Sequence, residues 1–211
     1  MTGPIEPDAR KMQALQGQLL LNKIRMKMYK IVDEFAQGEI SREQFNQIYE
    51  HYQSQMVMAM QMSDAESVGD SSGTSRETIA IRNSLTAKAK AMTVYYHATG
   101  LLLETIGDFD VSVARIAPEL NRISAGVQTG QKISIHSEKL DNQWLLYVPG
   151  RFSTAVLLFS NEPSTRQTNI IENMHHDFEI ANEAALRSGR ADGTTLVYPF
   201  QLFVRRTVRK P

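Results

Sequence analysis

The sequence predicts an α+β protein: a single five- to six-stranded, mostly antiparallel sheet with helices on both faces, preceded by an N-terminal α-helical hairpin. Two observations support this fold class. Between Thr93 and Leu186, apolar runs and amphipathic segments follow in the order strand, strand, helix, strand, strand, strand, helix. Residues 8–62 instead keep a helical period throughout. We therefore expect a hairpin (1–62), a flexible linker (63–75) and a folded domain (76–211).

The N-terminal segment should form two helices. Apolar residues recur every three to five positions from Met12 to Phe35, and Gly38 suits the end of the first helix because glycine readily adopts a left-handed conformation. Ser41 and Gln44 have the spacing of a capping box that opens the second helix. Such a hairpin has too little core to stand alone, so it should pack on the main domain or on a second copy.

The linker is predicted from composition, because residues 63–75 are small and polar and contain one sizeable apolar residue, Val68. A short helix over residues 78–90 should lead into the domain. Two strands, 93–97 and 101–106, should then pair through a turn at Thr99-Gly100.

The first helix of the predicted domain covers residues 111–127. Pro118 should weaken or kink it, and Gly126 and Gly130 should end it. Three strands are predicted next, at residues 133–135, 144–148 and 155–159. The last of these is continuously apolar, which is typical of a central strand covered on both faces.

A second helix should open at residues 161–164, with Pro163 near its first turn. Its expected buried face consists of Ile170, Ile171, Met174, Phe178, Ala181 and Ala185. Gly189 and the Asp192-Gly193 pair should end it. Residues 195–204 are predicted to form a final strand, partly confined to a sheet edge by Pro199.

Composition excludes several classes of protein. The 211 residues are 42% hydrophobic and carry 23 basic and 23 acidic side chains, so no global charge favours nucleic acid. The absence of cysteine excludes disulfides, thiolate metal sites and cysteine nucleophiles. The first residues lack a signal-peptide pattern, and the run Leu19–Leu21 is too short to span a membrane. We expect a cytoplasmic protein with no membrane span and no nucleic-acid partner.

The last helix carries the only spacing that could suggest a metal site. Glu172 and His175 are three residues apart, as in carboxylate-bridged di-iron bundles, and Glu179 continues that face. A di-iron site needs a second such motif on a facing helix, which this sequence lacks. The favoured interpretation is a solvated face opposite Ile171, Met174 and Phe178, comprising Glu172, His175, His176, Asp177, Glu179 and Glu183.

Catalytic templates also fail. The sequence has neither a Gly-x-Ser-x-Gly elbow nor a phosphate-binding glycine loop. His97 and His136 fall in predicted strands and are better interpreted as pleat-facing residues than as general bases. We therefore predict no enzyme activity and assign no catalytic, cofactor-binding or metal residue.

Two further features could mediate contacts. Met56, Met58, Met60 and Met62 alternate along the second helix, so some must be exposed, and an interface role and simple packing are about equally favoured. The basic residues of the segment 205–210 are expected to be solvated.

Residues 92–188 resemble the roadblock family of profilin-like or longin-like α/β/α folds. The resemblance lies in the order of elements, a glycine-hinged first hairpin at residues 100–104, a helix that follows Asp110-Val-Ser112, and a strand that ends at Tyr147-Val-Pro-Gly150. The usual Asp-Gly turn is here Thr99-Gly100. The resemblance implies a non-enzymatic homodimer or heterodimer that binds small Ras-like GTPases or acts as a scaffold, and it assigns no contact residue.

Two functions remain open. The first is a regulatory or scaffold protein acting by protein–protein interaction, a homodimer with a small Ras-like GTPase as its partner. The alternative is a sensory domain that binds a small ligand between sheet and helices, in a cavity bordered by groups such as Tyr95, His97 or His136.

Overall fold

The computed structural model describes residues 7–66, 87–189 and 191–199. The chain separates into two compact units, Met1–Ile79 and Ala80–Pro211, which we call the helical unit and the sheet unit. Residues 67–75 of the predicted linker and 78–86 of the predicted lead-in helix lie outside the described residues. Residues 63–66 of that linker are helical, because the second helix continues to Glu66.

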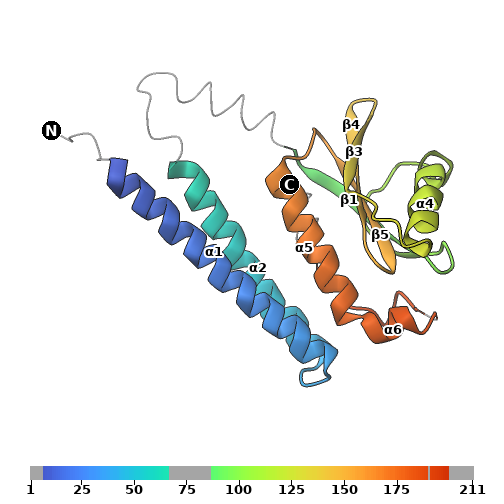
Figure 1. Cartoon of the computed structure of the whole chain (residues 1–211), viewed down its shortest axis with the longest axis horizontal. Coiled ribbons are helices and arrows are strands. Elements are labelled where there is room, and N and C mark those ends of the chain that lie inside the picture. The colour runs from blue at the N-terminus through green and yellow to red at the C-terminus, as the bar shows by residue number, and fades with distance from the viewer. Residues whose placement is uncertain (1–6, 67–86, 190, 200–211) are drawn as a thin grey trace. The chain divides into compact units, whose positions relative to one another are not determined.

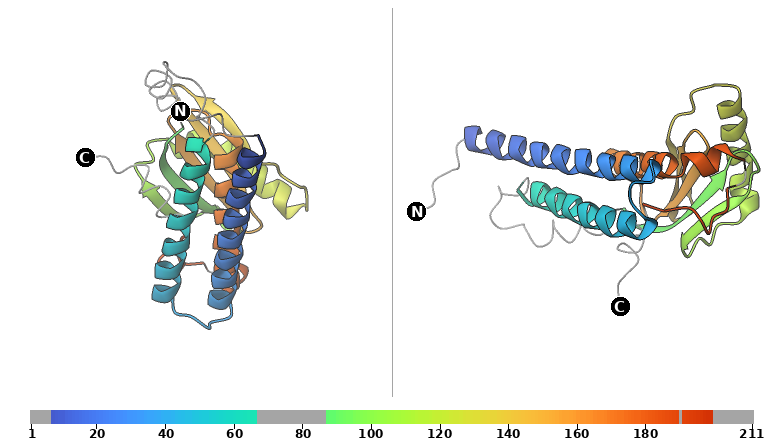
Figure 2. Two further views of the ribbon diagram at one scale, coloured as in Figure 1. Left: turned by 90° about the vertical axis from the view of Figure 1, so that its left-hand side faces the viewer. Right: turned by 90° about the horizontal axis from the view of Figure 1, so that it is seen from below.

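The helical unit contains two helices, α1 (Pro7–Ala36) and α2 (Arg42–Glu66), which run antiparallel and pack along each other (Figure 2). Their shared core is formed by side chains that recur every three or four residues. It consists of Ile24, Met28, Val32, Phe45, Tyr49 and Met56. The rings of Phe35 and Phe45, 4.9 Å apart, close the end nearest the turn. The helical hairpin that the periodicity predicts is therefore present.

The ends of the two helices follow the sequence closely. Gly38 adopts a φ of 77°, the left-handed conformation expected after a helix. The Gln44 amide donates to Ser41 Oγ at 3.2 Å, and the Ser41 amide donates to Gln44 Oε1 at 2.8 Å. These two reciprocal bonds confirm the predicted capping box.

The sheet unit contains a five-stranded, fully antiparallel sheet in the order β2-β1-β5-β4-β3. Its strands are β1 (Ala89–Tyr96), β2 (Leu102–Gly107), β3 (His136–Leu140), β4 (Gln143–Pro149) and β5 (Ser153–Phe159). Every residue of β5 is buried. The prediction of a central strand over 155–159 is thus confirmed.

Helices cover both faces of this sheet (Figure 1). On one face lie α5 (Thr165–Ala181) and the short α6 (Glu183–Arg187), which contribute Ile171, Met174, Phe178 and Leu186 to a core with alternate residues of the strands. On the other face, α4 (Val113–Gln128) contributes Ile116 and Ile123. None of the helices in the described ranges is long and apolar enough to cross a membrane.

The predicted strand 133–135 is wrong, because these residues have no regular structure and β3 begins at His136. Residues two apart in a strand point to the same face. Ile133 instead packs on the α4 side and Ile135 on the α5 side. Ile133 Cδ1 also lies where a Cβ on Gly126 would be, so Gly126 serves close packing inside α4, whereas Gly130, with a φ of 75°, follows the helix end.

The predicted helix 78–90 is wrong over the part that can be described. Residues 87–91 alternate between buried alanine and exposed lysine, the period of a strand, and β1 begins at Ala89. Ala87 and Ala89 are buried in the core on the α5 side, and Ala91 in the core on the α4 side.

The last predicted strand is also wrong over residues 195–199, which form turns and bends; residues 200–204 lie outside the described part. Leu196, Val197 and Tyr198 are buried in succession rather than alternately. The Asn182 side chain replaces a neighbouring strand: its Oδ1 accepts from the Val197 amide at 3.0 Å and its Nδ2 donates to the Val197 carbonyl at 2.9 Å. Asn182 also separates α5 from α6, so the predicted single helix is broken there.

Substitution of Gly107 by alanine should lower the free energy of unfolding of the sheet unit by about 3 kcal/mol. Gly107 has a φ of 81°, and a Cβ there would lie 2.5 Å from the Lys90 carbonyl oxygen on β1. Gly100 has a similar φ of 69° but open space around it, so Gly100→Ala should cost only about 1 kcal/mol. Denaturant unfolding of both variants checks this, and equal losses would mean that the contact with β1 is unimportant.

Candidate functional site

The carboxylate of Glu179, near the end of α5, accepts four hydrogen bonds. It accepts the amide hydrogens of three successive residues in the turn between β4 and β5: Arg151 at 2.7 Å, Phe152 at 2.9 Å and Ser153 at 2.8 Å. Successive amides that converge in this way form an anion-binding nest. The carboxylate, only 7% exposed, is the anion that fills it.

The turn is shaped to admit this carboxylate. A Cβ on Gly150 would collide with both oxygens of Glu179, so glycine allows the close approach. The Gly150 amide donates to the Ser153 carbonyl at 2.8 Å and closes the turn around the carboxylate. The helix and the turn therefore hold each other in place.

Ser153 and His175 extend the cluster into the core. Ser153 Oγ lies 2.9 Å from Glu179 Oε1 and 2.9 Å from His175 Nε2. A hydroxyl has one proton, so when it donates to the carboxylate, the imidazole Nε2 carries a hydrogen and donates to Oγ. This is the opposite of an activated serine, whose hydroxyl donates to the histidine. Ser153 is also completely buried.

Burial controls the protonation of the two histidines of this cluster. Desolvation lowers the pKa of His175, opposed by the charge of Glu179 and reinforced by His97 and His176. Desolvation also lowers the pKa of His97, and the negative charge of Glu179 again opposes this shift. His97 Nε2 lies 2.7 Å from Thr154 Oγ1, and among the described residues its buried Nδ1 has no hydrogen-bond partner. Burial therefore favours the neutral form of both rings.

The predicted solvated face of this helix is half wrong. Glu172 and His176 are exposed, but His175, Asp177 and Glu179 are buried. Ile171, His175 and Glu179 follow at steps of four, so they share one buried side of the helix. The turn between β4 and β5 supplies the amides that hydrogen-bond the buried carboxylate. Because Glu172 is exposed while His175 is buried, the Glu-x-x-His pair forms no common site.

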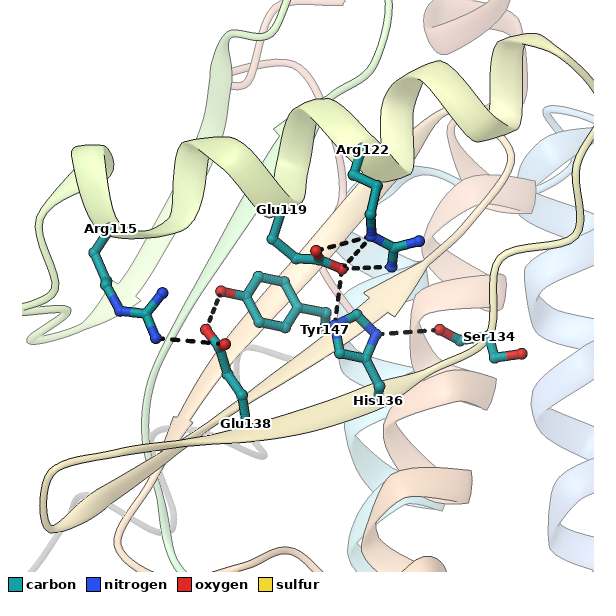
Figure 3. A network of polar contacts seen from close by, with 7 residues as sticks. All are labelled: Arg115, Glu119, Arg122, Ser134, His136, Glu138 and Tyr147. Carbon is teal, nitrogen blue, oxygen red and sulfur yellow. Dashed lines mark hydrogen bonds and ion pairs between the residues drawn. The ribbon is translucent and has the colours of Figure 1, made fainter.

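A second polar network joins α4 to β3 and β4 on the opposite face (Figure 3). Arg122 donates to both oxygens of Glu119, at 2.6 to 3.1 Å, and His136 Nε2 lies 2.9 Å from the same carboxylate. The hydrogen bonds from Arg122 hold the pKa of Glu119 below its ordinary value. The His136 ring stacks on Tyr147 with its centroid 5.0 Å away.

The other half of this network is built on Glu138 of β3. The Tyr147 hydroxyl donates to it at 2.9 Å, and Arg115 of α4 lies 3.4 Å from its other oxygen (Figure 3). Burial, followed by the bond to Glu138, raises the pKa of Tyr147. The two carboxylates thus tie α4 lengthwise to the edge strand β3. The sequence carries a signal for this network that no prediction above uses: Arg115, Glu119 and Arg122 are spaced four and three residues apart, on one side of the helix.

The remaining predicted contact residues fall into different environments. Met56 is buried between α1 and α2, and Met58 is 62% exposed. The side chains of Met60 and Met62 and the basic segment 205–210 lie outside what can be described. No group of three or more histidine, aspartate or glutamate side chains in the described ranges is placed to hold a metal ion. Both polar clusters therefore join elements of the fold.

Glu179→Gln should lower the free energy of unfolding by about 2–4 kcal/mol, because an amide nitrogen would then face donors of the turn. Glu172→Gln, an exposed change of the same chemistry on the same helix, should change it by less than about 0.5 kcal/mol. Urea unfolding followed by circular dichroism compares them. Equal stability of the two variants would show that the nest does not need its anion.

Comparison with known proteins finds no match: no protein-family model, no curated protein and no solved structure resembles this chain closely enough to count. The resemblance to the roadblock family therefore stays a prediction, and the arguments below start from the geometry of the two units.

Proposed function

We propose that this protein acts without catalysis, as a regulatory or scaffold protein that forms a homodimer through its sheet unit and binds a small Ras-like GTPase. The dimer is supported by one observation, the open edge of the sheet at β3. The GTPase is supported only by the resemblance of residues 92–188 to the roadblock family.

The two edges of the sheet differ. Along β2, the Leu103 carbonyl accepts a hydrogen bond from the Tyr198 hydroxyl at 3.3 Å, and Gly193 lies against the same oxygen so closely that a Cβ would not fit. The segment 191–199 therefore covers part of that edge. At β3, the described residues include only one neighbouring strand, β4, so the outer backbone groups are available to another chain.

The exposed face of α4 has the chemistry of a contact between helices. Ala114, Pro118, Asn121 and Ala125 are exposed and follow at steps of four, three and four, the spacing of a helix–helix seam. They lie opposite the buried Ile116 and Ile123. Small side chains permit close approach of two helices, and the Glu119 and Glu138 contacts place this helix along β3. Both surfaces can thus take part in one two-fold interface.

The two other classes of function find less support. The only serine–histidine pair of the buried cluster is sealed from solvent, which argues against a hydrolase. Binding of a ligand between sheet and helices needs a concave cavity. Tyr95 is instead 8% exposed within the α4-side core, His97 is bonded to Thr154, and His136 to Glu119. No specific observation favours the sensory alternative.

Ala125→Glu should weaken self-association by about tenfold or more, because a two-fold interface brings two new carboxylates together. The matched control is Ala184→Glu, an exposed alanine on α6. Size-exclusion chromatography with light scattering over micromolar concentrations measures the mass. A wild-type monomer throughout that range would contradict the dimer.

The GTPase partner is tested separately, with small Ras-like GTPases encoded in the same genome. Calorimetric titration of each, loaded with GDP or with a GTP analogue, should give saturable binding for one of them. If none binds, the GTPase assignment fails while the dimer is unaffected.

A further inference from the structure

The helical unit carries a second apolar surface that its own core does not use. Leu15, Leu19 and Met26 are 62%, 57% and 68% exposed. At steps of four and seven they share one side of α1, which we call the α1 stripe, about 16 Å long. Leu15 and the buried Ile24 are nine residues apart, so the stripe lies about 180° from the side that packs on α2.

The charge of the helical unit is strongly divided. Residues 9–32, most of α1, contain six lysines and arginines and no acid; Asp33 and Glu34 follow at the end of the same helix, and α2 contains four acids and one arginine. Lys23 and Lys30 are exposed and follow Leu19 and Met26 by four residues, so each lies beside the α1 stripe. Lys30 also pairs with Glu34 at 3.4 Å. The stripe therefore lies within a basic surface, while the α2 side is acidic.

Two arrangements of a second copy leave the α1 stripe unsatisfied. A two-fold pair of copies would bring α1 against α1, two segments of the same high positive charge. If α1 of one copy packs on α2 of the next, each added copy leaves its own α1 stripe exposed. Such an assembly grows as an open chain and does not close into a defined oligomer.

The side chains distinguish between anionic partners. Exposed leucine and methionine contribute nothing to phosphate contacts with nucleic acid, which depend on charge. A single helix side is convex, and lysine is a point charge that lacks the forked geometry with which arginine recognises one carboxylate or phosphate. Large aliphatic side chains beside lysines, on a helix whose residues 9–32 carry no acid, match the boundary between headgroups and acyl chains of an anionic bilayer.

We propose that the α1 stripe, together with Lys23 and Lys30, docks the helical unit on the surface of an anionic membrane. The leucines and methionine enter the headgroup boundary, the lysine stems reach along it, and the acidic α2 side faces water. This contact lies along the membrane surface and uses residues of the helical unit alone, none of them in the proposed dimer interface.

The test is co-sedimentation of the full chain with phosphatidylcholine vesicles that contain about one third phosphatidylserine. Wild-type protein should sediment with these vesicles, remain in solution with pure phosphatidylcholine, and be released at about 1 M salt, where the Debye length is about 3 Å. Met26→Ser and Lys23→Glu should each weaken binding by about tenfold. The matched control is Met58→Ser, which removes an equally exposed methionine from the α2 side and should leave binding unchanged.

Circular dichroism of each variant verifies that the helices persist, as exposed positions should allow. The proposal is overturned if wild-type protein ignores the anionic vesicles or if Met58→Ser weakens binding as much as Met26→Ser. It is also overturned if Met26→Ser lowers the molecular mass in light scattering, which would assign the stripe to a second copy. Equal binding of wild type and Met26→Ser to duplex DNA, without vesicle binding, would assign the basic surface to nucleic acid.

Discussion

The sheet unit depends on the carboxylate of Glu179 in the nest of amides at residues 151–153. Burial of a charge is costly unless its hydrogen bonds are satisfied, and here three amides and a hydroxyl satisfy them. The nest begins directly before β5, the central strand, so the same contact fixes the entry of that strand and the position of α5 above it. His175 and Ser153 add a neutral layer between the charge and the core.

The opposite face is held by a different kind of contact. The carboxylates of Glu119 and Glu138 are part-exposed; Glu119 is paired with Arg122 and His136, and Glu138 with Arg115 and Tyr147. Exposed ion pairs stabilise little individually. Their effect here is geometric, because they orient α4 along β3 while Ile116 and Ile123 supply the apolar contact. The α5 side is thus fixed by a buried charge, and the α4 side by apolar packing that the ion pairs orient.

Most of the fold could be predicted because local signals and tertiary packing agree. The continuous apolar run of β5, the capping box at Ser41 and the glycine-hinged hairpin of β1 and β2 all appear where the sequence places them. The predicted strands that are wrong, 133–135 and 195–199, are those whose apolar residues are partly or fully buried without belonging to a strand. Ile133 and Ile135 are apolar and two apart like strand residues, yet they fill opposite cores. Residues 196–198 are apolar because they are buried, while the backbone of Val197 pairs with the Asn182 side chain and not with a strand.

The buried cluster was missed for a related reason. A histidine and a glutamate in a helix normally indicate a solvated face, and only the three-dimensional position of the turn 150–153 reveals the amides that permit their burial. The steps of four from Ile171 to Glu179 place these residues on one side of the helix and so indicate burial. The amides that bind the carboxylate belong to another part of the chain, so the helix sequence does not reveal them. Polar positions are therefore predictable from periodicity only when their partners lie on the same element.

The two proposed surfaces reinforce each other in a way that neither unit achieves alone. The α1 stripe offers three large apolar side chains and few lysines, and a contact of this size with a bilayer is weak and reversible. A dimer of the sheet unit carries two such stripes on one particle. Once the first has docked, the second binds at the high effective concentration set by the connection within the dimer. Self-association would then control residence at the membrane, and any partner that competes for α4 or the β3 edge would release the protein from the bilayer without touching the helical unit.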